Sequence, residues 1–208
     1  MKTRPLTFIL LVALSFLCGC TGLEVLEPQK DTTRFYILET PFDPDRTREL
    51  APEGPRVYLG GGSIAKHLQD SRLALRSPGS NEIVYADQHR WAEPLADGVV
   101  RILVTSLSRR LGSPRVSLQR FAAGSESDYQ VGFHIHKLGG EPGKAVRLHA
   151  SWWVQEKEKT EPVLHETLLE ESLPAEDTSH ATFVRGLQNL IVSWADEIAA
   201  ALEPEDES

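Results

Sequence analysis

Residues 129–155 read YQVGFHIHKLGGEPGKAVRLHASWWVQ, and this stretch decides the fold. Apolar side chains occupy every second position over 129–135 and again over 146–154, with polar or small residues and one tryptophan, Trp153, between them. Such alternation is typical of β-strands that have one buried and one exposed face. The segment GGEPG at 139–143 joins the two runs, so we predict a hairpin in an antiparallel sheet that is covered on one side.

Shorter strands are predicted on both sides of this hairpin, where apolar runs are bounded by glycine, proline or polar turns. The glycines at 60–62 end one of them, and Ser63 is expected to cap a short helix that reaches Leu68. A glycine-rich turn before a helix can bind phosphate. This one lacks the Gly-Lys-Ser/Thr ending of a nucleotide loop, so a structural turn is favoured. The predicted strands are 34–38, 56–59, 72–76, 82–86 and 163–173.

Two long amphipathic helices are predicted, over 93–111 and 178–202. In both, apolar residues recur at spacings of three and four, which gives a helix one apolar stripe. Pro94 suits the first turn of the earlier helix, and Gly112 ends it. Two helices packed on one face of a largely antiparallel sheet form a two-layer α+β fold. We expect a single domain over 35–203, followed by an acidic tail at 204–208.

The N-terminus has the pattern of an export signal. Lys2 and Arg4 precede an uncharged, mainly apolar run at 6–17, which is too short to span a bilayer core and matches the apolar part of a signal peptide. Leu-Cys-Gly-Cys at 17–20 follows, and it resembles the lipobox of bacterial lipoproteins. The resemblance implies that 1–19 is removed, that Cys20 carries a covalent lipid with acyl chains such as palmitate, and that 20–34 is a lipidated tether.

Charge excludes one class of partner. The chain has 208 residues, 22 of them basic and 30 acidic, and a formal charge of −8. Removing residues 1–19 takes away two basic groups, and 20 − 30 leaves −10. A chain this acidic is not expected to bind nucleic acid, and it gains little from anionic headgroups. Acyl chains on Cys20 would therefore hold it to the membrane.

Three histidines form the main candidate for a chemical site. His134 and His136 lie on one face of a predicted strand, and His149 lies on the matching face of its hairpin partner. Such a set could bind zinc with an open position, and Glu166 and Glu170 are the carboxylates that could support it. A periplasmic zinc-dependent enzyme is therefore an alternative function. The other explanation is a solvated strand face that happens to carry histidines. We expect no catalytic residues, no metal and no cofactor besides the lipid.

Tryptophan stands on both faces of the second hairpin strand. Trp152 alternates with the apolar residues and is expected in the core, whereas Trp153 is on the polar face. A large aromatic residue there could contact a partner protein, a second copy of the chain or a lipid headgroup. Isolated exposed aromatic residues are also common, so both interpretations stay open.

The string Arg90-Trp91-Ala92-Glu93-Pro94-Leu95 is the most distinctive in the body of the chain. Pro94 would start the helix, Trp91 would pack at its entry, and Arg90 and Glu93 could pair across the turn. With the lipobox and the strand at 35–38, this string resembles the ABC-type transport auxiliary lipoproteins, the PqiC/YmbA family. One departure is Gly-Gly-Ser-Ile at 61–64, where the family tends to have Pro-x-Tyr-Leu.

The resemblance implies a non-enzymatic subunit that binds and positions a partner. The implied partners are an MCE-domain periplasmic protein and an inner-membrane permease, in a system that moves lipids or hydrophobic compounds and supports envelope integrity. Thr21, rather than Asp, follows Cys20, which implies the periplasmic face of the outer membrane rather than the inner membrane. A homo-oligomer is possible. A lipid-carrying chaperone is a further alternative, and it would need a cavity.

Overall fold

The computed structural model describes residues 31–41, 49–76, 79–119 and 126–203. The described residues from 33 onward belong to one compact unit. The predicted signal peptide, Cys20 and the acidic tail lie outside the described residues. Within the described part, neither long helix combines the length and apolar character required to cross a bilayer.

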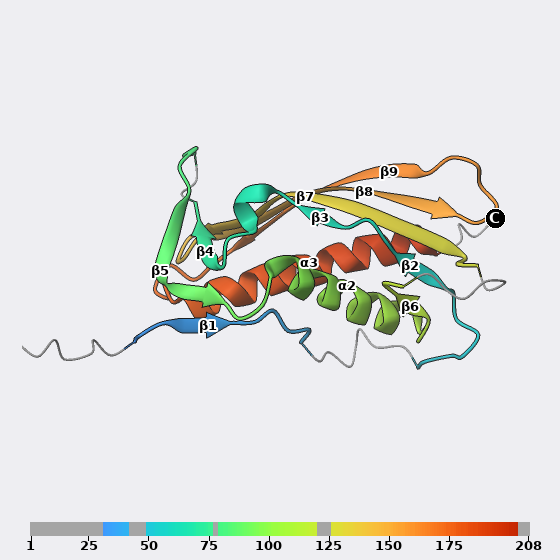
Figure 1. Cartoon of the computed structure of the whole chain (residues 1–208), viewed down its shortest axis with the longest axis horizontal. Helices are drawn as coiled ribbons and strands as arrows, with labels where there is room; N and C mark the ends of the chain where they lie inside the picture. The colour runs from blue at the N-terminus through green and yellow to red at the C-terminus, as the bar shows by residue number, and fades with distance from the viewer. Residues whose placement is uncertain (1–30, 42–48, 77–78, 120–125, 204–208) are drawn as a thin grey trace, which may run out of the picture. The chain divides into compact units, whose positions relative to one another are not determined.

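Three long strands form an antiparallel meander (Figure 1). They are β7 (Tyr129–Glu141), β8 (Ala145–Glu156) and β9 (Val163–Ser172). The predicted hairpin is confirmed, with Phe133 opposite Trp152. Its turn is shorter than expected: β7 continues through Glu141, and Gly143 takes the positive φ of 73°.

Short strands extend the sheet, and most of them pair in parallel. Both β2 (Val57–Leu59) and β3 (Ser63–Ile64) pair parallel to β7. The predicted hairpin of β4 (Arg72–Leu75) with β5 (Val84–Trp91) is confirmed as antiparallel. The sheet is therefore mixed, with its antiparallel character concentrated in the long strands. The remaining strands are β1 (Arg34–Tyr36), parallel to β5, and β6 (Val116–Ser117), parallel to β2.

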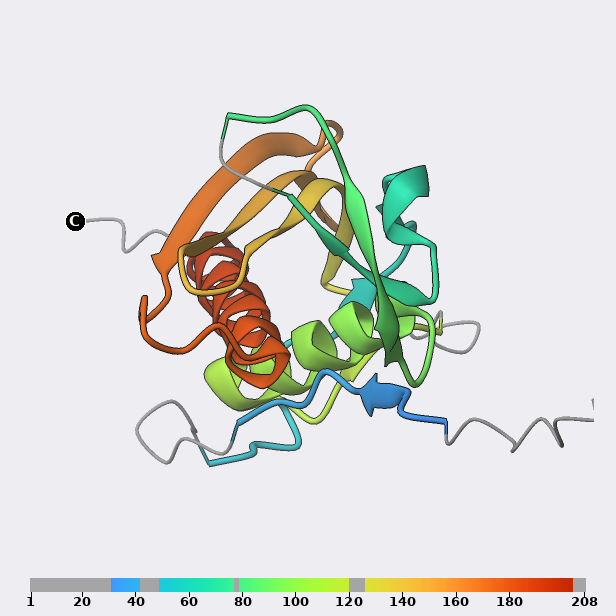
Figure 2. The same ribbon diagram turned by 90° about the vertical axis from the view of Figure 1, so that its left-hand side faces the viewer.

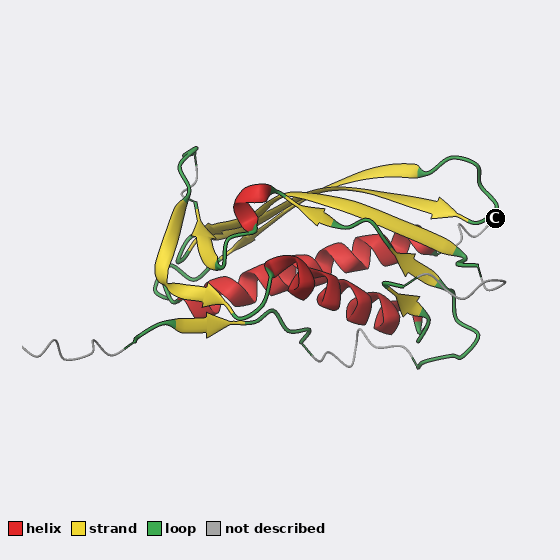
Figure 3. Ribbon diagram, viewed as in Figure 1, coloured by secondary structure: helices red, strands yellow, loops and turns green. Residues whose placement is uncertain are grey.

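Both helices lie on one side of the long strands (Figure 3), which confirms the predicted α+β fold. Helix α2 spans Leu95–Leu111 and ends at Gly112, whose φ of 60° is left-handed. Helix α3 spans His180–Leu202 and runs beneath the arch of β7 to β9 (Figure 2). Its Trp194 is fully buried and meets the ring of Phe133 edge-on at 5.2 Å. Helices and sheet thus share one core, whose buried apolar residues run from Leu38 to Leu202.

The prediction for Ser63 is wrong. Ser63 lies in β3, and the short helix is a 3-10 turn at Lys66–Leu68, preceded by Ala65 without a side-chain cap. Gly62 before it serves close packing, since a Cβ on Gly62 would lie 2.4 Å from the Phe133 ring, and Gly61 takes a positive φ of 77°. Strand pairing with β7 outweighs the helix-capping preference of serine here, and the glycines support the structural interpretation of this turn.

Candidate partner-binding surface

The sheet face turned away from the helices carries the most exposed large apolar side chains of the described residues. Leu164 and Leu168, both on β9, are 78% and 70% exposed. They alternate with buried Thr167 and half-buried His165 along the strand, so they share the outer face. Strand β9 pairs with β8 alone in the described sheet, which leaves it at an edge. An exposed apolar edge strand is a natural place for another chain to bind.

Trp153 stands beside this edge on β8, directly opposite Leu164. Its indole lies across the backbone of Gly132 on β7: a Cβ built on that glycine would be 2.4 Å from the ring. The ring is only partly exposed, because glycine allows it to lie flat on the strand. As predicted, Trp152 points the other way and is buried. A rigid aromatic ring next to exposed leucines has the composition of a protein-binding patch. We call Trp153, Leu164 and Leu168 the outer patch.

The three predicted histidines do come together on this face. The ring centroids of His134 and His136 are 4.7 Å apart, and those of His136 and His149 are 4.6 Å apart. Burial lowers the pKa of His136, and the charges of His149 and His134 lower it further. The cluster therefore forms as the strand register predicted.

Each of these imidazoles already has a separate hydrogen-bonding partner. His134 Nδ1 lies 2.8 Å from Ser63 Oγ, and His136 Nε2 lies 2.7 Å from Ser151 Oγ. His149 Nε2 lies 2.6 Å from a Glu166 carboxylate oxygen, at an exposed position. Among the described residues, no group of three or more His, Cys, Asp or Glu side chains is arranged to hold a metal ion. The geometry is that of a hydrogen-bonded polar strip, and it gives the zinc-enzyme alternative no support.

The distinctive string at 90–95 forms a joint between strands and helix. Arg90 and Trp91 end β5, where they pair with Phe35 and Tyr36 of β1. Trp91 is buried at 8% exposure, and its amide donates to the Ser71 carbonyl at 2.7 Å. Pro94 is the residue immediately before the first turn of α2 rather than inside it. An interface role for these residues stays a prediction.

Glu93 does not pair with Arg90 as the spacing suggested. The Glu93 carboxylate accepts two hydrogen bonds from Arg101 of α2, which lies eight residues further along the chain. These hydrogen bonds lower the pKa of Glu93. The same guanidinium donates to the Leu38 carbonyl at 2.7 Å. The ion pair thus ties the segment after β1 to the start of the helix. The observed partner of Glu93 is thus Arg101 on the helix, and the predicted pair of Arg90 with Glu93 is wrong.

Sequence reasoning missed Leu164 and Leu168. The run at 163–173 was predicted as a strand, but its outward face was not identified. The alternation of Leu164, Glu166, Leu168 and Glu170 was the available signal. The even-numbered and the odd-numbered positions of this strand both contain apolar residues. The pattern alone therefore does not show which of the two sets faces outward, and the pairing with β8 is needed to decide it.

Comparison with solved structures supports the fold. An uncharacterized protein of known crystal structure has a TM-score of 0.66 at 16% identity, covering 82% of this chain and 99% of its own. A Xanthomonas campestris protein assigned to family DUF330 has a TM-score of 0.63 at 13% identity, covering 82% and 94%. No curated protein matches the sequence.

A family model described as the ABC-type transport auxiliary lipoprotein component matches residues 36–199. The matched region includes both helices apart from the last residues of α3, the three long strands and the joint at 90–95. It covers well over half of the chain, and the chain belongs to the ABC-type transport auxiliary lipoprotein component family.

Proposed function

We propose that this protein is a lipid-anchored periplasmic subunit that binds and positions the MCE-domain component of a transport system for lipids or hydrophobic compounds. The match of the family model over residues 36–199 carries the proposal, because it identifies an auxiliary component of ABC-type transport. The subunit acts by binding, without catalysis, and so supports envelope integrity. The permease in the inner membrane is its indirect partner.

The outer patch is the surface we assign to the MCE partner. Its two leucines are the most exposed large apolar side chains of the described residues, and Trp153 is held flat beside them. Apolar surface of this kind is stabilised when a partner removes it from water. A second copy of the chain is the competing occupant, and the experiment below separates the two.

Anchoring at Cys20 places this surface in the periplasm. The expected lipid holds the chain to the outer membrane, and the tether at 20–34 gives the body reach. A flexible chain of this length extends roughly 20 Å by square-root scaling.

Affinity purification of the full chain from cross-linked envelopes tests the function. The MCE-domain protein should co-purify with the wild type. Replacing both patch leucines, L164S with L168S, should reduce its recovery at least tenfold. L118S is the matched control, since Leu118 is 51% exposed and lies just after β6, outside the outer patch. Deleting the gene should sensitise cells to membrane-active compounds.

The outcomes separate the function from the surface. If no MCE-domain protein accompanies the wild type and deletion leaves the envelope unchanged, the proposed function is wrong. If the partner is recovered equally with the double variant, only the assignment of the outer patch is wrong. If the double variant instead loses a cross-linked dimer, the patch joins two copies of the chain.

A further inference from the structure

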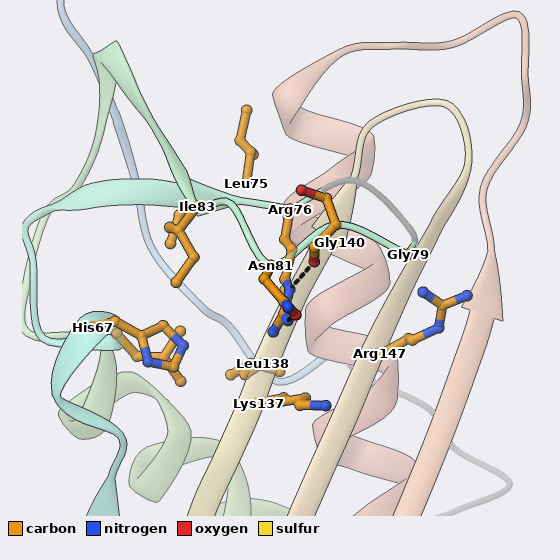
Figure 4. A pocket seen from close by; sticks show the side chains of 14 residues that line it. His67, Leu75, Arg76, Gly79, Asn81, Ile83, Lys137, Leu138, Gly140 and Arg147 are labelled. Carbon is orange, nitrogen blue, oxygen red and sulfur yellow. Dashed lines mark hydrogen bonds between the residues drawn. The ribbon is translucent and has the colours of Figure 1, made fainter.

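A pocket of about 280 Å³ lies beside Leu138 and Gly140 of β7 (Figure 4). It sits beside β7 between two parallel pairings: β3 pairs as far as Ile135, and β4 pairs at Gly140. Residues 137–140 of β7 form one wall, and β4 with the start of the following turn forms another. The pocket therefore lies beside the part of β7 between Ile135 and Gly140, where neither β3 nor β4 pairs with it.

The pocket combines an apolar lining with basic side chains. Apolar groups come from four elements or turns, namely Leu68, Leu75, Ile83 and Leu138. Four basic residues line it as well, and none of the described lining residues is acidic. This runs against the composition of the chain, which has 30 acidic and 22 basic residues. The four are His67, Arg76, Lys137 and Arg147.

Two of these cations have no ion-pair partner among the described residues. Arg76 donates from Nε to the Ser80 carbonyl at 2.9 Å and from Nη2 to Asn81 Oδ1 at 3.2 Å, and both acceptors are neutral. Among the described residues, neither Arg76 nor Lys137 has a recorded ion pair. Arg147, by contrast, is paired with Glu170 at 2.5 Å. The two neutral bonds hold the Arg76 guanidinium in place while leaving its charge available to a ligand.

The positive charge of Arg76 also affects His67. Burial lowers its pKa, and the positive charge of Arg76 lowers it further. The imidazole is thus neutral at pH 7, close to a cation, and able to donate or accept a hydrogen bond. An anion bound to Arg76 would reverse the electrostatic part of this effect.

We propose that this pocket binds an amphipathic organic anion, a carboxylate or phosphate monoester carried on a short apolar chain. The charged head lies between Arg76 and Lys137, and the chain covers the leucines and Ile83. The volume is just under the range of roughly 300–1,000 Å³ usual for drug-sized ligands, so a whole diacyl lipid does not fit. The pocket accordingly does not make the protein a lipid-enclosing chaperone, and this ligand is separate from the MCE partner.

Calorimetric titration of the full chain in a neutral detergent tests the site. Hexyl phosphate or hexanoate should bind saturably at one equivalent. Inorganic phosphate, which lacks the chain, and hexyl glucoside, which lacks the charge, should bind at least tenfold more weakly. Tighter binding of hexanoate supports a carboxylate as the head, and tighter binding of hexyl phosphate supports a phosphate ester.

Variants locate the binding. The pair R76Q with K137Q should weaken hexyl phosphate at least tenfold. The control pair K144Q with K157Q removes the same charge from residues paired elsewhere, with Glu141 and Glu126, and should stay within twofold of the wild type. Full affinity in the first pair, or equal binding of hexyl glucoside, would overturn the proposal.

A measurement on the wild-type chain tests the site without relying on the folding of any variant. Saturation with hexyl phosphate should raise the pKa of the His67 imidazole, followed by NMR titration of its ring protons. An unchanged His67 titration at saturation would place the ligand elsewhere and overturn the assignment.

Discussion

The imidazole rings of His89 and His180 stack with their centroids 3.7 Å apart and 13° between their planes. His89 belongs to β5, and His180 is the first residue of α3. The Tyr36 hydroxyl of β1 is hydrogen-bonded to His89 Nδ1 at 2.8 Å. The pair therefore holds together three elements that are far apart in sequence. His180 Nε2 is buried without a hydrogen-bond partner among the described residues.

This pair should make the fold less stable in mild acid. Burial lowers the pKa of both histidines; Arg34 lowers that of His89 further, and His89 and Arg34 lower that of His180. An unfolded histidine titrates near 6.5, so the unfolded chain gains protons that the folded chain resists as pH falls below that value. The stability is complete above pH 6.5 and is lost as pH falls toward the lowered values. Melting temperature should therefore drop between pH 7.5 and pH 5.

H180Q and H89Q should each lose less melting temperature over this range than the wild type does. Each kcal/mol of recovered stability corresponds to about 2–4 °C in a chain of this size. Part of the acid effect should remain, because the pKa values of His67 and His136 are also lowered. A variant with the same pH dependence as the wild type would show that the stacked pair does not titrate in this way.

A second prediction concerns Gly132 beneath Trp153. In G132A the new methyl group would meet the indole at 2.4 Å, so the ring has to leave the strand. We expect a loss of about 1–3 kcal/mol in the free energy of unfolding, measured by urea denaturation. The ring would also lose its position on the outer patch, and MCE recovery should fall with it.

A double-mutant cycle checks the cause. If the clash with Trp153 produces the loss, G132A should cost less in a W153A background, with a coupling of at least about 0.5 kcal/mol. Additive effects would mean that the alanine acts on the backbone alone.

The long elements were predictable because their signal repeats. The apolar spacing predicted helices over 93–111 and 178–202, and they span Leu95–Leu111 and His180–Leu202. The same holds for the alternating pattern of β7 and β8, which also predicted that His134, His136 and His149 would meet. A β-bulge between Ile135 and Lys137 interrupts the register, and the cluster forms across it.

The short strands and the sites built on them were not predictable in this way. Strands of two to four residues, such as β3 at Ser63–Ile64, contain too few positions to show a period. Their parallel pairing depends on where distant segments pack. The basic pocket lies between β3 and β4 and depends on their pairing with β7. No local sequence pattern therefore predicts it.

A third prediction concerns the start of α3. Ser179 Oγ accepts from the Thr182 amide at 3.2 Å, and S179A should cost about 1 kcal/mol, as loss of a helix cap usually does. Asp177 accepts from the Ser179 amide at 2.9 Å and from the Thr182 hydroxyl. The Thr182 and Ser179 hydrogen bonds lower the pKa of Asp177 from 3.8 to about 2.

That lowered pKa determines the pH range of the Asp177 contribution. The stability is present above pH 3.8 and is lost as pH falls toward 2, because the unfolded carboxyl is protonated first. D177N should melt below the wild type at pH 6, and the two should converge between pH 4 and pH 2. A constant difference across that range would mean that the asparagine disturbs the turn by its shape rather than by its charge.

The last prediction concerns a buried hydroxyl that ties α3 to the edge strand. Thr167 on β9 is 2% exposed. It accepts from Trp152 Nε1 at 3.0 Å and donates to a Glu197 carboxylate oxygen of α3 at 2.5 Å. T167V keeps the shape but removes both bonds and leaves the buried indole N–H without its acceptor. Such a loss costs about 1–3 kcal/mol, which urea denaturation would detect.

T167S is the matched control, because it keeps the hydroxyl and loses a single methyl group, worth about 0.8 kcal/mol. T167V should be the less stable of the two, although it is closer in shape to threonine. Thr167 lies on β9 between Glu166 and Leu168, so loosening it should also increase hydrogen exchange in the edge strand that presents the outer patch. If T167V instead matches the wild type in both stability and exchange, packing alone holds α3 beneath β9.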